Sequence, residues 1–179
     1  MEFRPTNLAG AYLVHLEPVR DQRGFFARTF CVEEFANHGL EIGYPQHSIS
    51  YSARKGTLRG MHYQRDPHRE AKLVRCTKGA ILDVIVDIRR DSSTFCRWQQ
   101  FELSSANGYQ LYVPKGFAHG FQTLCDDVEV SYLISTPYEP GFAGGIRYDD
   151  PALEIEWPLP ITEISEKDLH WPRFAESVL

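Results

Sequence analysis

Two stretches of the sequence gather side chains suited to proton transfer and anion binding. The first, Gly56–Gln64 (GTLRGMHYQ), carries Arg59 and His62 and is followed by Lys72, on a strand that we expect to neighbour it. Imidazole can act as a general base near neutral pH, and cationic side chains bind anionic oxygens. The same residues also fit a polar edge strand with a surface histidine. Strict alternation would place Arg59 and His62 on opposite faces, but a bulge at Gly60 would bring both inward.

The second stretch, Gly108–Gln122 (GYQLYVPKGFAHGFQ), places His119 between two phenylalanines after a Pro-x-Gly turn. A histidine in aromatic surroundings is either a hydrogen-bonded core residue or a ligand. The spacing of His62 and His119 is that of metal-binding cupins, but such sites also need a His-x-His pair and a glutamate, and Gln64 occupies the second histidine position. Two histidines without a carboxylate are too few to hold iron, manganese or zinc stably. The sequence therefore predicts no metal.

Motifs for other cofactors and nucleophiles do not occur. The sequence contains neither GxGxxG nor GxxxxGK[ST], so a dinucleotide or ATP site is not indicated. It also lacks the GxSxG motif of serine hydrolases. We therefore expect no bound cofactor.

Two further features have both a structural and a chemical interpretation. Tyr132 lies in the alternating segment Val128–Ile134, where Val128, Val130 and Ile134 share its face. A phenol placed there inside an apolar barrel is either a hydrogen-bonded core group or a proton donor. Near the end of the chain, Ser165–Asp168 (SEKD) fits a capping box, and alone it indicates only a solvated helix start.

The elements that must position these residues are mostly short strands. The chain is punctuated by 11 prolines and 13 glycines at turn spacing, which indicates a sandwich or a barrel such as the jelly roll. A short helix is expected at Val32–His38, and a helical or irregular tail from Ser165 onward. The expected strands are Leu73–Cys76, Ala80–Ile88, Gln99–Leu103, Tyr109–Val113 and Val128–Ile134.

Composition sets the broad class of protein. The 179 residues are 42% hydrophobic and 24% charged, which fits one globular domain spanning residues 1–179 and excludes a largely disordered chain. A net charge of −5 argues against nucleic acid as a partner. No apolar run reaches the ~20 residues of a membrane-spanning helix, and the N-terminus lacks an apolar signal core. Because the four cysteines are also far apart, we expect reduced thiols and a cytoplasmic location without membrane contact.

In combination, these stretches resemble the dTDP-4-dehydrorhamnose 3,5-epimerase family. The resemblance implies an all-β, cupin-type jelly-roll β-barrel with short peripheral helices and no metal. It also implies a homodimer in which an N-terminal segment crosses to the partner, where Phe3, Tyr12 and Leu13 are apolar enough to pair with a neighbouring sheet, and a tail, residues 165–179, that packs near the site. The pieces that carry the resemblance, in order, are Asp21–Phe26, Gly56–Gln64, Ala71–Val74, Asp83–Arg89, Pro114–Phe121, Asp150-Pro151, Ile155–Pro158 and Ser165–Asp168.

The resemblance also implies roles for individual residues. His62 matches the base, Asp168 the carboxylate that orients it, Lys72 the cation that stabilises an enolate oxygen, and Tyr132 the acid on the opposite face. The implied reaction is epimerisation of a nucleotide-linked 4-keto-6-deoxy sugar at C3, C5 or both, in deoxysugar biosynthesis. Hydrogens on both carbons are acidic because each carbon adjoins the carbonyl. The residues expected to bind this nucleotide sugar are Arg23, Phe26, Gln46, Arg59, His119 and Lys167.

Three positions depart from the family's pattern. Arg28 and Ala143 occupy places where glutamate is common, and Ser48 replaces the asparagine of a Gln-x-Asn motif. All three positions belong to substrate binding, so the reaction type is better supported than the identity of the nucleotide or the sugar. The alternatives are a nucleotide-sugar 3,4-ketoisomerase, a non-catalytic cupin that binds sugar nucleotides, and a metal-dependent cupin enzyme.

Overall fold

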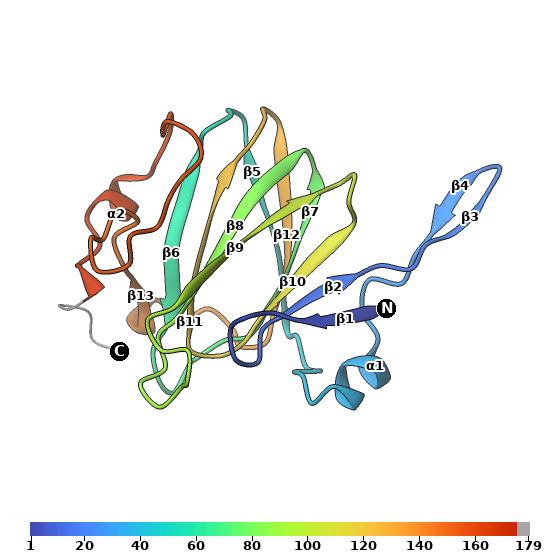
Figure 1. The fold of residues 1–179 in the computed structure, drawn as a ribbon, viewed down its shortest axis with the longest axis horizontal. Coiled ribbons are helices and arrows are strands. Elements are labelled where there is room, and N and C mark those ends of the chain that lie inside the picture. Colours follow the sequence, from blue (N-terminus) through green and yellow to red (C-terminus); the bar gives the residue numbers. More distant parts are fainter. Residues whose placement is uncertain (175–179) are drawn as a thin grey trace.

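Two antiparallel β-sheets face each other across the core of the computed structural model, which describes residues 1–174 (Figure 1). The first sheet has the spatial order β1 (Glu2–Pro5), β2 (Tyr12–His15), β10 (Tyr109–Val113), β7 (Lys72–Lys78), β12 (Val128–Ile134) and β5 (Gln46–Ser52). The second has the order β13 (Ala143–Gly145), β6 (Leu58–Gln64), β11 (Phe117–Thr123), β8 (Ala80–Asp87) and β9 (Trp98–Ser104). The helical segments are α1 (Val32–Asn37), η1 (Pro140–Phe142) and α2 (Glu166–Leu169).

This strand-rich architecture with short peripheral helices is the one that the sequence predicts. β10 and β12 have the predicted bounds, and β7, β8 and β9 differ from the prediction only at their ends. Helix α1 ends at Asn37, one residue before the predicted end, because His38 is its C-terminal cap. Within residues 1–174, no helix is long and apolar enough to cross a membrane.

The main core fills the space between the two sheets. Val74 and Val130 enter it from the six-stranded sheet, and Ile85 and Phe121 enter it from the five-stranded sheet. Because successive side chains of a strand point to opposite faces, Tyr132, two residues after Val130, also faces inward and packs against this core. The prediction that Tyr132 lies on the inner face of its strand is confirmed.

The outer face of each sheet is covered by a different part of the chain. On the six-stranded sheet, Phe35 of α1 packs against Leu73. Phe3 and Tyr12 belong to the same cluster, and Leu13 packs against the main core. In this chain the three N-terminal side chains are partly buried by their own subunit, and their pairing with the sheet of a neighbouring subunit stays a prediction. On the five-stranded sheet, the cover is the segment that follows β13.

One hairpin takes no part in either sheet. Strands β3 (Val19–Asp21) and β4 (Gly24–Phe26) pair only with each other and project away from the barrel (Figure 1). The side chains of Val19, Phe25 and Phe26 are more than half exposed. The projecting arm thus carries an apolar surface that the described chain leaves uncovered.

The strands that carry His62 and Lys72 are not neighbours, and that prediction is wrong. β6 lies in the five-stranded sheet and β7 in the six-stranded sheet, so residues 65–71 cross from one sheet to the other. Two short strands separated by a turn look alike in sequence whether they form a hairpin or change sheets. As a consequence, His62 and Lys72 lie on opposite walls of the barrel.

A bulge in β6 determines which of its side chains reach the barrel interior. In the pairing with β11, His62 lies opposite His119 and Arg59 lies opposite Phe121, so β6 has one residue more than its partner between these pairs. Gly60 is at φ +133°, and a Cβ there would lie 2.6 Å from the Cα of Gly120. Only glycine fits this conformation and this close approach. The predicted bulge at Gly60 is confirmed.

We expect Gly60→Ala to lower the free energy of unfolding by about 2–4 kcal/mol, because left-handed strain and the clash with β11 add. Urea unfolding monitored by circular dichroism measures this loss. Gly24→Ala is the matched control, since Gly24 has a similar φ of +129° but nothing within 4 Å of its Cβ position. If Gly60→Ala lowered the free energy of unfolding no more than Gly24→Ala does, the close approach of β6 and β11 would not constrain residue 60.

Candidate active site

A cavity of about 620 Å³ opens between the two sheets at the end covered by α2. Its walls come from β5, β7 and β12 on one side and from β6 and β11 on the other. Eight of the ten residues predicted for the site line it, namely Gln46, Arg59, His62, Lys72, His119, Tyr132, Lys167 and Asp168. The fold therefore brings most of the predicted site together from segments far apart in the sequence.

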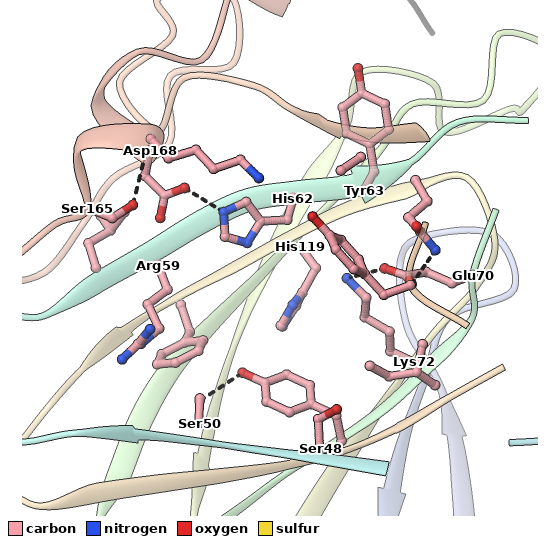
Figure 2. A pocket seen from close by; sticks show the side chains of 18 of the residues that line it. Ser48, Ser50, Arg59, His62, Tyr63, Glu70, Lys72, His119, Ser165 and Asp168 are labelled. Carbon is pink, nitrogen blue, oxygen red and sulfur yellow. Dashed lines mark hydrogen bonds and ion pairs between the residues drawn. The ribbon is translucent and has the colours of Figure 1, made fainter. Parts of the chain in front are cut away.

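His62 and Asp168 form a hydrogen-bonded pair on the β6 wall (Figure 2). The distance from His62 Nε2 to Asp168 Oδ1 is 2.6 Å. Asp168 is held in place because Ser165 caps α2 by accepting a hydrogen bond from the Asp168 amide. The backbone N–H of Gly60 donates to Asp168 Oδ2 at 3.2 Å. The β6 bulge at Gly60 and helix α2 are therefore joined through the Asp168 carboxylate.

The protonation of this pair follows from its surroundings. Burial works against ionisation of Asp168, but the hydrogen bond and charge of His62, the Gly60 amide and the Trp171 indole together hold the pKa of Asp168 below its ordinary value. An ionised carboxylate can only accept, so the proton of the neutral imidazole lies on Nε2. His62 Nδ1 is then left with a free lone pair. The side chain of His62 is 43% exposed, so the ring remains accessible from the cavity.

Tyr132 stands on the opposite wall, on β12 of the six-stranded sheet. Its hydroxyl lies 3.3 Å from the hydroxyl of Ser50 on β5. Burial raises the pKa of Tyr132 well above its ordinary value, so the phenol stays protonated. The cavity therefore has a basic nitrogen on one wall and an O–H donor on the other.

Lys72 contributes a cation to the wall that carries Tyr132. Its ammonium lies 3.0 Å from Glu70 Oε1, and both side chains are about nine-tenths buried (Figure 2). Glu70 Oε2 accepts a hydrogen bond from Gln64 Nε2 at 3.0 Å. An ammonium held in this way can stabilise negative charge that develops on a nearby oxygen without rearranging.

His119 belongs to a second, deeper histidine–aspartate pair. His119 Nε2 lies 2.8 Å from Oδ2 of Asp83 on β8, and both side chains are buried. Burial raises the pKa of Asp83, against the opposing influence of His119 and Lys72. Asp83 Oδ1 has no hydrogen-bond partner among residues 1–174. His119 is therefore both a hydrogen-bonded core histidine and a cavity residue, which were the two interpretations that the sequence left open.

The other predicted binding residues in the cavity differ in how firmly they are held. Arg59 donates to Ser52 Oγ at 3.1 Å and to the carbonyl of Tyr51 at 2.8 Å, which ties β6 to β5. Gln46 accepts from the Tyr138 amide at 2.9 Å. Lys167 lies at the α2 end, with its ammonium 5.0 Å from the centre of the Trp171 ring.

Two predicted binding residues lie outside the cavity. Arg23 and Phe26 are on the projecting hairpin, where Arg23 pairs with Asp21 and Phe26 is 77% exposed. Of the three positions that depart from the family pattern, Ser48 and Ala143 line the cavity, whereas Arg28 does not and pairs with Glu34 at 3.0 Å.

The sequence reasoning missed several side chains around the cavity. Glu70 stands two residues before Lys72, so a carboxylate this close to a predicted site cation was a usable signal. Trp171 lies just after α2, three residues beyond Asp168, and its indole reaches back to the Asp168 carboxylate. Ser50 and Asp83 gave no signal, because only strand pairing brings them to Tyr132 and His119.

The described residues do not fit a metal centre. Within residues 1–174, no group of three His, Cys, Asp or Glu side chains is arranged to hold a metal ion. His62 and His119 face each other across β6 and β11, but each bonds through Nε2 to an aspartate. The chemistry derived below is therefore assigned to protein side chains.

We expect Asp168→Asn to lower the maximal rate and to move the acidic limb of the kcat/KM profile to lower pH. Activity falls in acid as His62 takes up a proton, and an amide stabilises the resulting imidazolium less than a carboxylate does. Folding lowers the pKa of Asp168, so its carboxylate also stabilises the folded chain at pH values above the ordinary pKa of aspartate. This stabilisation is lost as the pH falls through the lowered pKa. Initial rates measured between pH 4.5 and 9 check the limb, and an unmoved limb would contradict the pairing of His62 with Asp168.

With its two facing sheets and a cavity between them that is lined by ionisable side chains, the molecule is a cupin-type jelly-roll barrel with a candidate active site. The model of the family described as dTDP-4-dehydrorhamnose 3,5-epimerase matches residues 5–176. The chain belongs to this family and is an isomerase-class enzyme, as its sequence motifs predict.

Individual relatives cover nearly the whole chain. A dTDP-4-dehydrorhamnose 3,5-epimerase of Sinorhizobium fredii is 42% identical over 98% of this chain and 91% of its own. The crystal structure of the Bacillus anthracis dTDP-4-dehydrorhamnose 3,5-epimerase with TDP and PPi bound has a TM-score of 0.93, at 39% identity over 96% of this chain and 98% of the other. A 3′-monoepimerase from Streptomyces bikiniensis in complex with dTDP-quinovose has a TM-score of 0.89, at 33% identity over 96% of this chain and 87% of its own.

Proposed function

We propose that this enzyme epimerises a nucleotide-linked 4-keto-6-deoxy sugar, similar to dTDP-4-dehydro-6-deoxyglucose, at C3, C5 or both. The observation that carries the proposal is the placement of the His62–Asp168 pair and the Tyr132 hydroxyl on opposite walls of one cavity. Inversion of a carbon requires that a proton leaves from one face and returns to the other. A ketoisomerase that moves its proton along one face needs no second acid.

The reaction conserves protons at each step. His62 Nδ1 takes the hydrogen from the carbon next to the C4 carbonyl, and the electron pair of that C–H bond forms the enolate double bond as the carbonyl becomes an oxyanion. Tyr132 then gives its O–H proton to the opposite face of the carbon, and the carbonyl is restored. The phenolate regains a proton from solvent, and the imidazolium returns its proton to solvent.

Lys72 is the group that we assign to the enolate oxygen. Its ammonium is nearly buried, and Glu70 and the crossing segment fix its position. Electrostatic stabilisation is strongest where donors are oriented before charge develops and water is excluded. Loss of a donor of this kind typically lowers the rate by ~10²–10³.

Arg59 and Lys167 are the cationic groups that we assign to the diphosphate of the substrate. They come from β6 and α2, near the His62–Asp168 pair. Guanidinium groups bind phosphate oxygens in a bidentate geometry, so a local cationic pocket is compatible with the acidic net charge of the chain. The bound TDP and PPi of the Bacillus anthracis relative support this class of ligand.

Arg23 and Phe26 enter the proposal through a homodimer. The hairpin that carries them projects away from its own barrel (Figure 1). The rings of Phe25 and Phe26 on it are exposed. We propose that it inserts at the cavity of a partner subunit, where Arg23 would add a further cation. Ser48 and Ala143, both in the cavity, are the positions at which we expect the choice of nucleotide or sugar to differ from that of the family.

Deuterium uptake tests the proposal. The purified protein is incubated in D₂O with dTDP-, UDP-, CDP- and GDP-linked 4-keto-6-deoxyglucose, and the sugars are followed by NMR. We expect deuterium at C5, at C3 or at both, together with inversion of the labelled carbon, and the labelled positions count the centres that react. Three results would overturn the proposal: no uptake with any nucleotide, a 3-keto product, or binding of a nucleotide sugar without exchange.

A further inference from the structure

A tryptophan that takes no part in the reaction as proposed touches the carboxylate of the catalytic pair. Trp171 follows α2 and lines the cavity. Its indole Nε1 donates a hydrogen bond to Asp168 Oδ1 at 3.0 Å. This is the oxygen that also accepts from His62, at 2.6 Å. The ring of Trp171 lies edge to face with the His62 ring, with the two centroids 6.2 Å apart.

The ring of Trp171 is itself fixed by its surroundings. It packs against the backbone of Gly145 on β13 so closely that a Cβ at residue 145 would lie 2.2 Å from Trp171 Cδ2. The Lys167 ammonium lies over the Trp171 ring, 5.0 Å from the ring centre. The next residue is anchored too, because the Arg147 amide donates to the Pro172 carbonyl at 3.0 Å. Such packing holds the indole N–H in a defined direction.

We infer that Trp171 is a positioning residue, which orients Asp168 through the indole N–H and so sets the direction and basicity of His62. The carboxylate then has three fixed donors: His62, the Gly60 amide and the Trp171 indole. With all three present, its orientation relative to the imidazole is determined. The inference rests on the proposed role of His62 as base.

Removing the indole N–H should strengthen the hydrogen bond between Asp168 and His62. With one donor fewer, the Asp168 carboxylate interacts more strongly with His62 and favours its imidazolium form. The acidic limb of the kcat/KM profile then moves to higher pH, opposite to the shift expected for Asp168→Asn. Among the other ionisable groups that line the cavity, Lys167 is the one whose ammonium lies over the Trp171 ring, and Trp171→Phe keeps an aromatic ring beneath it. The remaining ionisable groups of the lining are Arg59, Tyr63, Glu70, Lys72, His119, Tyr132, Tyr138 and Glu163.

Trp171→Phe is the variant of choice, since it removes the N–H and keeps an aromatic ring against Gly145 and Lys167. Trp157→Phe is the matched control, because the Trp157 indole donates at 2.9 Å to the carbonyl of Tyr148, away from the cavity. We expect Trp171→Phe to lower kcat by about 10-fold, since loss of orientation at a catalytic group is costly, with KM changed less than 3-fold. Trp157→Phe is expected to leave both kcat and the acidic limb as in the wild type.

Gly145→Ala tests the same contact from the other side. It keeps the indole but forces the ring to shift, so it should also lower kcat. A double-mutant cycle shows whether Trp171 acts through Asp168: in the background of Asp168→Ala, which has no acceptor, Trp171→Phe should cost less than 2-fold. Equal losses in both backgrounds would mean that Trp171 acts independently of Asp168 and would overturn the inference.

A readout without substrate separates this inference from the proposed function. The downfield proton resonance of the His62 Nε2–H, identified by its loss in His62→Asn, should move further downfield in Trp171→Phe and stay in place in Trp157→Phe. If this resonance moves while the wild type epimerises nothing, the positioning contact stands and the proposed function fails. If the resonance and the acidic limb both stay in place in Trp171→Phe, Trp171 does not position the pair and the inference is wrong.

Discussion

His62→Asn is expected to lower kcat for epimerisation by about 10³-fold and to abolish deuterium uptake at the reacting carbon. Asparagine has no nitrogen lone pair that can accept a proton from carbon at neutral pH. The side chain is 43% exposed, so the substitution leaves the core intact and KM should change little. Steady-state kinetics and NMR in D₂O measure the two effects.

His15→Asn is the control for this variant. His15 lies on β2, outside the cavity, and is also partly exposed, so its loss should leave turnover within about 2-fold of the wild type. If His62→Asn kept a tenth or more of wild-type exchange, a different group would have to remove the proton. That result would contradict the assignment of the base.

Tyr132→Phe is expected to separate exchange from inversion. His62 can still remove the proton and return deuterium from the same face, so recovered substrate should carry label with its configuration retained. Net epimerisation should fall by about 10²–10³-fold, because the acid on the opposite wall is gone. The ring still packs against the core, and only the contact of its hydroxyl with Ser50 is lost.

Tyr112→Phe controls for the loss of a buried phenol. The Tyr112 hydroxyl accepts from the Glu41 amide at 3.2 Å, and this residue does not line the cavity. We expect its turnover to match that of the wild type. If Tyr132→Phe lost exchange and inversion in equal measure, Tyr132 would act before or during proton removal and not as the acid that completes inversion.

The sequence allowed those parts of the site to be predicted that follow from a local pattern. Alternation along β12 placed Tyr132 on the inner face, since a strand has a period of two. The glycine at position 60 indicated the bulge that brings Arg59 and His62 to the same cavity. The link between His62 and Asp168, far apart in the chain, came only from the resemblance to a family, and the structure joins them by a hydrogen bond.

What could not be predicted depends on how distant strands come together. Residues 65–71 change sheets, so Lys72 lies opposite His62, whereas the sequence suggested neighbouring strands. The pairing of His119 with Asp83 results from the register of β11 against β8, which neither strand specifies alone. Arg23 and Phe26 stand on an arm outside their own barrel, and no local pattern shows where such an arm docks.

The central claim is that the sugar is held between a base on one sheet and an acid on the other. Its most direct test is a crystal structure of His62→Asn with an unreacted nucleotide-linked 4-keto-6-deoxy sugar bound. We predict that residue 62 and the Tyr132 hydroxyl lie on opposite faces of the sugar ring, each about 3–3.5 Å from the same reacting carbon or its hydrogen, with the C4 oxygen next to Lys72. A ring that lies with both residues on one face, or with its C4 oxygen away from Lys72, would contradict the account.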